Sequence, residues 1–226
     1  MKKVIIAGSS GFIGKSLVKY MKRRYEVIEL DLVKGQDLTD EKFVKAWFKK
    51  NRANYLVNLF GLNDHVGSGR QKQNIFTVPL ESFERYMKVN LTAMFSVCRE
   101  FARNNRKDDR AIVNFSSTYG VVSPFPNMYN GKEKHIGYSV SKAGIIMLTK
   151  HLAAHLAPGM RVNCVVPGGI KGKQSAKFKK EYSSRTPIGR MMKVSEINGI
   201  VSYLCSDESS YATGAIFCID GGWTIW

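Results

Sequence analysis

The amino-acid sequence predicts a single α/β domain with a parallel sheet. Short apolar runs alternate with longer segments of helical periodicity, which is the pattern of repeated β-α units. A glycine-rich turn follows the first apolar run, at the place where such domains bind nucleotides. The 226 residues contain no internal repeat and no linker rich in proline, glycine or serine, and this length suits one domain with a complete core.

Each element is expected from its own apolar pattern. Near-continuous apolar runs, typical of strands buried on both faces, predict strands at 4–7, 26–30, 55–59, 111–115, 161–165 and 216–219. Helical periodicity predicts helices near 11–24, 40–51, 81–105, 138–156 and 194–206. Only five residues separate Asp31 from Asp37, too few for a crossover helix. The second β-α-β unit is therefore expected to be shortened after its first strand. Either the unit is reduced to a short loop, or its next strand is vestigial.

The charge of the chain is its unusual bulk property. A formal net charge of +17 is compatible with a nucleic acid, an anionic membrane surface, an acidic small substrate or simply a lysine-rich surface. Nucleic acid is disfavoured because no aromatic stripe interleaves with the basic residues. No run reaches the roughly 18 apolar residues of a membrane span, so no membrane association is expected. The four cysteines are scattered without metal-ligand spacing, so we expect reduced thiols, no metal and a cytoplasmic location.

The glycine-rich turn reads GSSGFIG over residues 8–14, directly after a strand and at the start of a helix. Glycines there permit a tight turn and close approach of a pyrophosphate, and the helix N-terminus attracts the anion. The second strand ends at Asp31, 17 residues after Gly14. A carboxylate in this place accepts hydrogen bonds from ribose hydroxyls and repels a 2′-phosphate, which favours NAD and leaves NADP open. The alternative is that Asp31 simply caps the end of the strand.

Tyr138 and Lys142 are four residues apart on an expected helix, so their side chains share one face. A phenol ordinarily titrates near pH 10, and a neighbouring ammonium group favours its phenolate form. The pair could therefore act as a general acid/base near neutral pH. Such a spacing is common by chance on exposed helices, and the pair alone does not establish a site.

Several motifs occur in order from residue 4 to the C-terminus: the turn at 8–14, Asn58, Asn90, SSTYG at 116–120, YSVSK at 138–142, RVN at 161–163 with PGG at 167–169, and DGG at 220–222. Together they resemble the short-chain dehydrogenase/reductase family. The resemblance implies a Rossmann-like, doubly wound parallel sheet in a single domain over residues 1–226. It also implies hydride transfer between a nicotinamide cofactor and an alcohol or carbonyl carbon.

The resemblance assigns four catalytic residues. Tyr138 would be the proton donor or acceptor, and Lys142 would bind the nicotinamide ribose and lower the pKa of Tyr138. Ser117 would orient the substrate oxygen, with Ser116 as a structural neighbour. Asn90 would complete a proton relay through an ordered water, although an asparagine inside a helix also often bonds only to the backbone.

The resemblance also assigns the cofactor contacts, which lie at the ends of the strands. They are Gly8, Ser10, Gly11, Phe12, Ile13, Gly14, Asp31, Asp37, Leu38, Asn58, Gly61, Tyr138, Lys142, Pro167, Gly168 and Ile170. Two positions depart from the family pattern. Phe60 replaces a small residue and is expected to crowd the site, and Gly172 stands where the family often has a cofactor-binding threonine.

Two segments are expected to contact the substrate. The serine-to-tyrosine spacing is twenty-one residues, longer than in most members of the family, and the surplus forms a loop at about 121–137. Tyr129 and Asn130 are candidate substrate contacts there, unless the loop is a passive surface feature. The stretch at about 169–193 corresponds to the substrate lid and carries eight basic residues against one acid over 171–193. A basic lid suits an anionic substrate such as an acidic or phosphorylated sugar, or it is merely a solvated surface.

A narrower resemblance concerns the substrate. The SSTYG start, the YNG inside the insertion, PIGRM at 187–191 and the DGGWTIW tail are similar to dehydrogenases of bacterial surface-glycan pathways, including flagellin modification and nonulosonic acid synthesis. The alternatives are a reductase of 3-oxoacyl thioesters, which an apolar insertion would favour, and a catalytically silent dinucleotide-binding regulator. The aromatic tail suits a subunit interface, and the family resemblance implies a homodimer or homotetramer.

Overall fold

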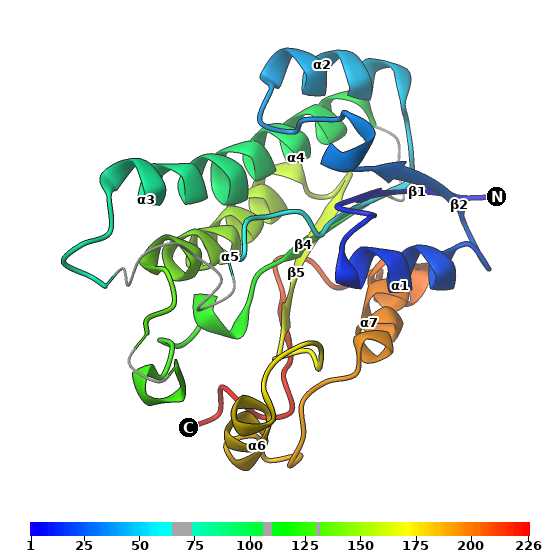
Figure 1. The fold of residues 1–226 in the computed structure, drawn as a ribbon. Coiled ribbons are helices and arrows are strands. Elements are labelled where there is room, and N and C mark those ends of the chain that lie inside the picture. The colour runs from blue at the N-terminus through cyan, green and yellow to red at the C-terminus, as the bar shows by residue number, and fades with distance from the viewer. Residues whose placement is uncertain (65–73, 106–109, 130–131) are drawn as a thin grey trace.

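The computed structural model describes residues 1–64, 74–105, 110–129 and 132–226. Six parallel strands form one sheet in the order β2-β1-β3-β4-β5-β6 (Figure 1). Their bounds are β1 Lys3–Ala7, β2 Glu26–Leu30, β3 Tyr55–Asn58, β4 Ala111–Phe115, β5 Arg161–Pro167 and β6 Ile216–Ile219. The single α/β domain with a Rossmann-like parallel sheet is confirmed.

Helices cover both faces of the sheet. They are α1 Phe12–Met21, α2 Glu41–Lys50, α3 Leu80–Met87, α4 Ala93–Asn104, α5 Ile136–Leu156, α6 Ala176–Ser184 and α7 Asn198–Leu204. Helices α2, α4 and α5 pack on one face through a cluster that includes Phe48 and Phe101. Helices α1 and α7 pack on the other face through Leu17 and Leu204 (Figure 1). Alternate strand residues supply the two clusters, which explains why the central strands are apolar along most of their length.

The expected shortening after β2 is a short loop. A 3-10 turn, Leu32–Lys34, follows β2, and the chain then enters α2, whose N-terminus is capped by the carboxylate of Asp40. Helix α2 returns the chain to β3, which pairs with β1 rather than with β2. Among the described strands β2 therefore pairs with β1 alone and is an edge strand of the sheet.

The long helix expected at 81–105 contains an irregular turn. Helices α3 and α4 are continuous through a π-helical turn at Lys88–Thr92, in which the amide of Ala93 bonds to the carbonyl of Lys88. The fully buried Asn90 lies in the middle of this turn. Turns of this type are enriched at functional sites because they re-aim side chains within a helix.

The insertion and the lid contain helices that the sequence did not predict. The insertion forms a 3-10 turn at Pro126–Tyr129, and the lid contains α6, which is capped by the hydroxyl of Ser175. Helix α6 has only Phe178 and Tyr182 as a large apolar pair among lysines, which is too weak a periodic signal for prediction. The two segments pack together in a third cluster that includes Met128 and Trp223.

The described ranges contain no helix long and apolar enough to cross a membrane.

Core packing gives a direct test of the fold. Phe101 of α4 is fully buried and meets the ring of Phe48 edge-on, with 6.2 Å between the ring centroids. Phe101→Ala is expected to lower the free energy of unfolding by about 3–5 kcal/mol because it leaves a cavity between α2 and α4. Phe95→Ala on the same helix is the control, since that ring is 42% exposed and should cost less than about 1 kcal/mol. Equal losses in urea unfolding would contradict this packing.

Candidate active site

The carboxyl ends of the parallel strands meet at one edge of the sheet, and the expected site residues follow them directly. Gly8 follows β1, Asp31 follows β2, and Ser116 and Ser117 follow β4. Gly168 follows β5 and donates its amide to the carbonyl of Ile219 in β6 (2.9 Å). Open α/β sheets bind their ligands at this edge.

The glycine-rich turn has the geometry that close approach of an anion requires. Gly8 has a φ of +86°, which favours glycine, and a Cβ on Gly14 would lie 2.2 Å from the carbonyl oxygen of Gly8. Helix α1 begins after Gly11 without any side-chain cap, so its first amides have no side-chain acceptor. The hydroxyl of Ser9 is buried and has no hydrogen-bond partner among the described residues. These features fit a nucleotide pyrophosphate.

The side chain of Phe12, another expected cofactor contact in this turn, is 59% exposed and is not packed in the core.

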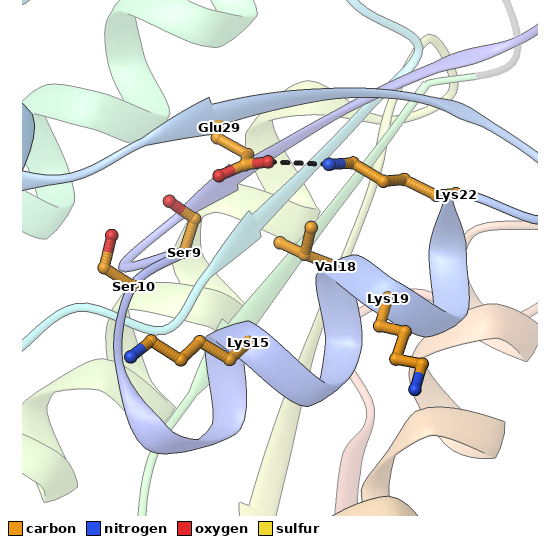
Figure 2. A pocket seen from close by; sticks show the side chains of 7 residues that line it. All are labelled: Ser9, Ser10, Lys15, Val18, Lys19, Lys22 and Glu29. Carbon is orange, nitrogen blue, oxygen red and sulfur yellow. Dashed lines mark hydrogen bonds and ion pairs between the residues drawn. The ribbon is translucent and has the colours of Figure 1, made fainter.

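A cavity of about 360 Å³ opens beside this turn, between α1 and β2. Figure 2 shows that Ser9 and Ser10 border it on the turn, that Lys15 and Lys19 border it on α1, and that Lys22 borders it just after the end of α1. Its only acidic lining residue in the described chain is Glu29, which pairs with Lys22 at 2.9 Å and with Lys34 at 2.8 Å. The surroundings of the turn are therefore positively charged, as an anionic ligand requires.

The carboxylate of Asp31 is buried at the end of β2 and binds two backbone amides. One oxygen accepts from Ser10 in the glycine-rich turn (2.8 Å) and the other from Val33 (3.1 Å). Asp31 thus caps the strand end and also ties it to the turn. A carboxylate has about four acceptor positions, so these two bonds leave capacity for ribose hydroxyls.

Other expected cofactor residues differ in where they point. Asn58 is fully buried and donates its side-chain amide to Asn114 across β3 and β4 (2.9 Å), so this side chain braces the sheet. Asp37 is exposed and accepts from the amide and hydroxyl of Thr39 (2.8 Å each), while Leu38 is a core residue. Phe60, expected to crowd the site, packs instead against the core cluster under α2, α4 and α5.

The strand-end glycines lie where backbone segments come close together. A Cβ on Gly61 would lie 3.1 Å from Oδ1 of Asn90 and 3.7 Å from Nζ of Lys142. Gly168 packs against the backbone of Asp220, and Pro167 is the last residue of β5. Ile170 forms an isolated bridge with Met192, which closes the base of the lid.

Ser117, Tyr138 and Lys142 form one group between β4 and α5. The hydroxyl of Ser117 hydrogen-bonds to Tyr138, and Nζ of Lys142 lies 5.9 Å from the centre of the Tyr138 ring. That ammonium donates to the carbonyl of Phe115 at the end of β4 (2.9 Å). Ser116 Oγ donates to the carbonyl of Lys142 (2.7 Å), which fixes α5 against the same strand.

Burial governs the titration of this group. It raises the pKa of Tyr138 above its ordinary value, and the hydrogen bond with Ser117 opposes the rise. Burial also lowers the pKa of Lys142 to about 8. The phenolate-favouring effect expected of Lys142 does not dominate, because its ammonium is directed at Phe115 and not at the phenol oxygen. Tyr138 is therefore a neutral phenol at pH 7, ready to donate a proton.

Asn90 connects three parts of the site. Its Oδ1 accepts from the amide of Leu62 (2.6 Å), and its Nδ2 donates to the carbonyl of Leu62 (3.2 Å) and to the hydroxyl of Ser141 (3.0 Å). Ser141 in turn donates to the carbonyl of Tyr138 (2.9 Å). The side chain of Asn90 therefore positions the segment after β3 against α5.

The insertion brings further tyrosines toward Tyr138. The hydroxyls of Tyr119 and Tyr129 hydrogen-bond to each other, and burial raises the pKa of Tyr129 to about 12 and that of Tyr119 further. The phenolate form of Tyr138 would raise the pKa of both groups further, which places them near Tyr138. Tyr119 did not stand out in the sequence. The other expected substrate contact, Asn130, lies outside the described residues.

The lid presents aromatic rings to the insertion and most of its charges to solvent. Tyr182 stacks on Trp223 with 4.2 Å between centroids, and Phe178 lies against Tyr129 at 5.8 Å. Arg190 forms an ion pair with Glu196 (2.6 Å). Exposed lid cations include Lys171, Lys173, Lys180 and Lys193. Trp223 of the aromatic tail is therefore a core residue of this cluster, whereas Trp226 is 75% exposed.

One site residue was missed altogether. Lys134, in the insertion, places its Nζ 4.5 Å from the centre of the Tyr138 ring. The sequence places Lys134 four residues before Tyr138, but an irregular insertion has no periodicity from which a contact between the two could be predicted.

Within the described ranges no group of three or more histidine, cysteine or acidic side chains is arranged to hold a metal.

Comparison with known proteins places this geometry in a family. Residues 14–224 match the family model described as enoyl-(acyl carrier protein) reductase. The chain is 31% identical over 229 residues to the 3-oxoacyl-(acyl-carrier-protein) reductase of Aquifex aeolicus, covering 97% of this chain and 86% of that protein. It is 34% identical over 157 residues to the 2-keto-3-deoxy-L-fuconate dehydrogenase of Xanthomonas campestris, covering 63% and 50%.

A solved structure agrees with these sequence relatives. The short-chain dehydrogenase of Leptospira borgpetersenii with bound NAD+ has a TM-score of 0.86 and 33% identity, over 99% of this chain and 92% of that one. The glycine-rich turn, the strand-end residues and these relatives lead to one conclusion. The chain belongs to the short-chain dehydrogenase/reductase family and is an oxidoreductase that uses a nicotinamide cofactor.

Proposed function

We propose that the chain moves a hydride between a nicotinamide cofactor and the carbonyl or alcohol carbon of a small, anionic, sugar-derived substrate. The observation that carries the chemistry is the grouping of Ser117, Tyr138 and Lys142 between β4 and α5. All three belong to elements that meet at the carboxyl edge of the sheet. A regulator that only binds dinucleotides would not need them together.

Each residue has a role that its surroundings support. In the reducing direction the Tyr138 hydroxyl donates its proton to the substrate oxygen, and Ser117 hydrogen-bonds to that same oxygen. The ammonium of Lys142 then stabilises the resulting phenolate electrostatically. The bound nicotinamide supplies the hydride. In the oxidising direction each transfer is reversed, with Tyr138 accepting the proton from the alcohol.

The cofactor is held, on this proposal, at the turn of residues 8–14 and at the strand ends. The pyrophosphate lies at the N-terminus of α1, where the amides have no side-chain acceptor. Asp31 accepts hydrogen bonds from the adenosine ribose, which favours NAD over NADP. Gly61 lies beside Asn90 and Lys142, and Gly168 packs on the backbone of Asp220, so both glycines bring the chain close to the site where the nicotinamide half would bind.

The substrate class rests on charge. The chain carries a formal net charge of +17, and eight basic residues against one acid lie over 171–193, in the segment that the family resemblance assigns to the substrate lid. The Xanthomonas relative is named for a keto sugar acid, which has this chemistry. The narrower similarity to surface-glycan and nonulosonic acid dehydrogenases remains a prediction, as do the insertion and the lid as substrate-binding segments. A homodimer or homotetramer and a cytoplasmic location are also still predictions.

A 3-oxoacyl thioester reductase is the second candidate. The Aquifex relative carries that name, and the insertion packs against the lid through Met128, Tyr129, Phe178 and Trp223. An apolar lining of this kind suits an acyl chain. Screening acidic sugars, phosphorylated sugars, nucleotide sugars and acetoacetyl thioesters for a cofactor-dependent absorbance change at 340 nm separates the candidates. Turnover restricted to the thioesters would reject the sugar proposal.

Tyr138→Phe tests the acid/base assignment. The variant keeps the ring and its packing but loses the proton, so turnover is expected to fall at least about 100-fold. The dissociation constant of NADH, measured by fluorescence, should change less than threefold. Tyr119→Phe is the matched control, because the Tyr119 hydroxyl bonds to the hydroxyl of Tyr129, and this variant is expected to keep at least a tenth of wild-type turnover. Near-normal turnover by Tyr138→Phe would reject the assignment.

Thermal shifts test cofactor choice. At equal concentrations NADH is expected to raise the melting temperature more than NADPH, because the buried carboxylate of Asp31 repels a 2′-phosphate. Asp31→Asn should reduce this difference. A larger shift with NADPH would show that the lysines around the adjacent cavity outweigh the carboxylate.

The buried charge of Lys142 is expected to cost stability. Its pKa is lowered from 10.5 to about 8 in the folded protein, so the unfolded chain holds more protons between pH 8 and 10.5. Lys142→Met removes that penalty. The difference in unfolding free energy, variant minus wild type, should therefore fall by about 2 kcal/mol from pH 7 to pH 10. The cysteines and tyrosines titrate in both proteins and cancel in the difference. A difference independent of pH in urea unfolding would contradict this account.

A further inference from the structure

A second lysine besides Lys142 lies against the ring of Tyr138. Nζ of Lys134 is 4.5 Å from the ring centre, closer than the 5.9 Å of Lys142. Lys134 belongs to the long insertion between Ser117 and Tyr138, whereas Lys142 belongs to the same helix as Tyr138. The insertion thus adds a cation to the substrate end of the site that the helix alone does not provide.

The ammonium of Lys134 is held in place by uncharged acceptors. It donates to Oδ1 of Asn63 (2.6 Å) and to the main-chain carbonyl of Asp64 (2.7 Å), both in the segment after β3. The carboxylate of Asp64 accepts instead from the hydroxyl of Tyr86 (2.9 Å). An ammonium has three donors, so two bonds orient Lys134 and leave one for a ligand.

The charge of Lys134 is only partly compensated. The group is half-buried, and burial lowers its pKa to about 8 while the charge of Asp64 opposes this effect. It is therefore still mainly protonated at pH 7. A partly desolvated cation with neutral partners gains when an anion binds it, because the desolvation cost has already been met in folding.

The other cations near the site are less suited to this task. Lys142 is directed at the carbonyl of Phe115, behind Tyr138. In the lid, Arg190 is paired with Glu196 and Arg185 lies on the ring of Phe125 at 3.6 Å. Lys134 thus approaches Tyr138 from the insertion, and within the described residues its ammonium makes two hydrogen bonds out of a possible three.

We propose that Lys134 binds the anionic group of the substrate and so determines the enzyme's preference for acidic carbonyl compounds. This inference rests on the proposed function and specifies its substrate as an anion whose charge lies a few bonds from the reacting carbonyl. A carboxylate bound at Lys134 lies beside the ring of Tyr138, while the carbonyl oxygen lies at the Tyr138 hydroxyl. The long insertion is then the segment that selects the substrate.

The test compares charged and neutral carbonyl probes in four proteins. Acetoacetate and methyl acetoacetate differ in one charge and are assayed with NADH in wild type, Lys134→Gln, Lys134→Arg and Lys132→Gln. Lys132 is an exposed lysine of the same insertion and serves as the matched control. For Lys134→Gln we expect the KM for acetoacetate to rise at least tenfold, with the KM for the ester and both kcat values within threefold. Lys134→Arg should recover most of the loss.

A binding measurement keeps the inference testable without turnover. Tartrate is titrated by calorimetry into wild type and Lys134→Gln, each saturated with NAD+. We expect saturable binding to the wild type that weakens at least tenfold in the variant and weakens with added salt. Absence of tartrate and acetoacetate binding in the wild type would overturn the inference. So would equal losses for acid and ester, which would make Lys134 a positioning residue for Tyr138.

The two proposals can fail separately. Suppose that none of the carbonyl compounds tested supports oxidation of NADH by the wild type, while tartrate binding depends on Lys134. The proposed function then fails and the anion site stands. If wild type reduces methyl acetoacetate and thioesters but Lys134→Gln leaves acid binding unchanged, the oxidoreductase assignment stands and the anion site is rejected.

Discussion

The active-site end of this protein depends on one buried charge, the ammonium of Lys142. This ammonium donates to the carbonyl of Phe115 at the end of β4, and the main-chain carbonyl of Lys142 accepts from the hydroxyl of Ser116. These two bonds hold α5 at a defined height on the sheet, and α5 carries Tyr138. The same burial that lowers the pKa of Lys142 raises that of Tyr138, so both groups are brought toward their neutral forms. The neutral phenol of Tyr138, with the ammonium of Lys142 nearby at a lowered pKa, is a suitable arrangement for exchanging a proton with a carbonyl oxygen.

Around this centre the fold joins segments that are distant in sequence. Asn90, in the π-helical turn between α3 and α4, fixes the segment after β3 against α5. The same segment supplies Asn63 and Asp64, which hold Lys134 of the insertion. Polar contacts therefore build one side of the substrate end, whereas aromatic rings of the insertion, lid and tail build the other. A substrate with one charged end and one apolar or hydroxylated face would use both sides.

The shortened connection after β2 shows how the scaffold is reduced without loss of the site. A 3-10 turn and a short loop lead from β2 directly into α2, and β2 is an edge strand of the described sheet. Strands β1 and β3 separate this edge from β4 and the catalytic group beside it, so the shortening is confined to the end of the sheet that carries Asp31. At that end Asp31 binds both the glycine-rich turn and its own loop, which holds the short connection in a single arrangement.

The sequence by itself determined the fold class, the strands and the motif residues of the site. Strand bounds such as 26–30, 111–115 and 216–219 agree with the structure. The strand at 111–115 is buried along its whole length, whereas the outer strands at 26–30 and 216–219 are partly exposed, and all three are short segments rich in apolar residues. Only the tertiary structure decided which way the side chains point. Asn58 bonds to Asn114 of the next strand and to Cys98 of α4, Trp223 stacks on Tyr182 of the lid, and Lys134 reaches Tyr138, because each position depends on partners from remote segments. Local periodicity predicts which face of an element is apolar, but contacts between an irregular insertion and a helix depend on packing in three dimensions.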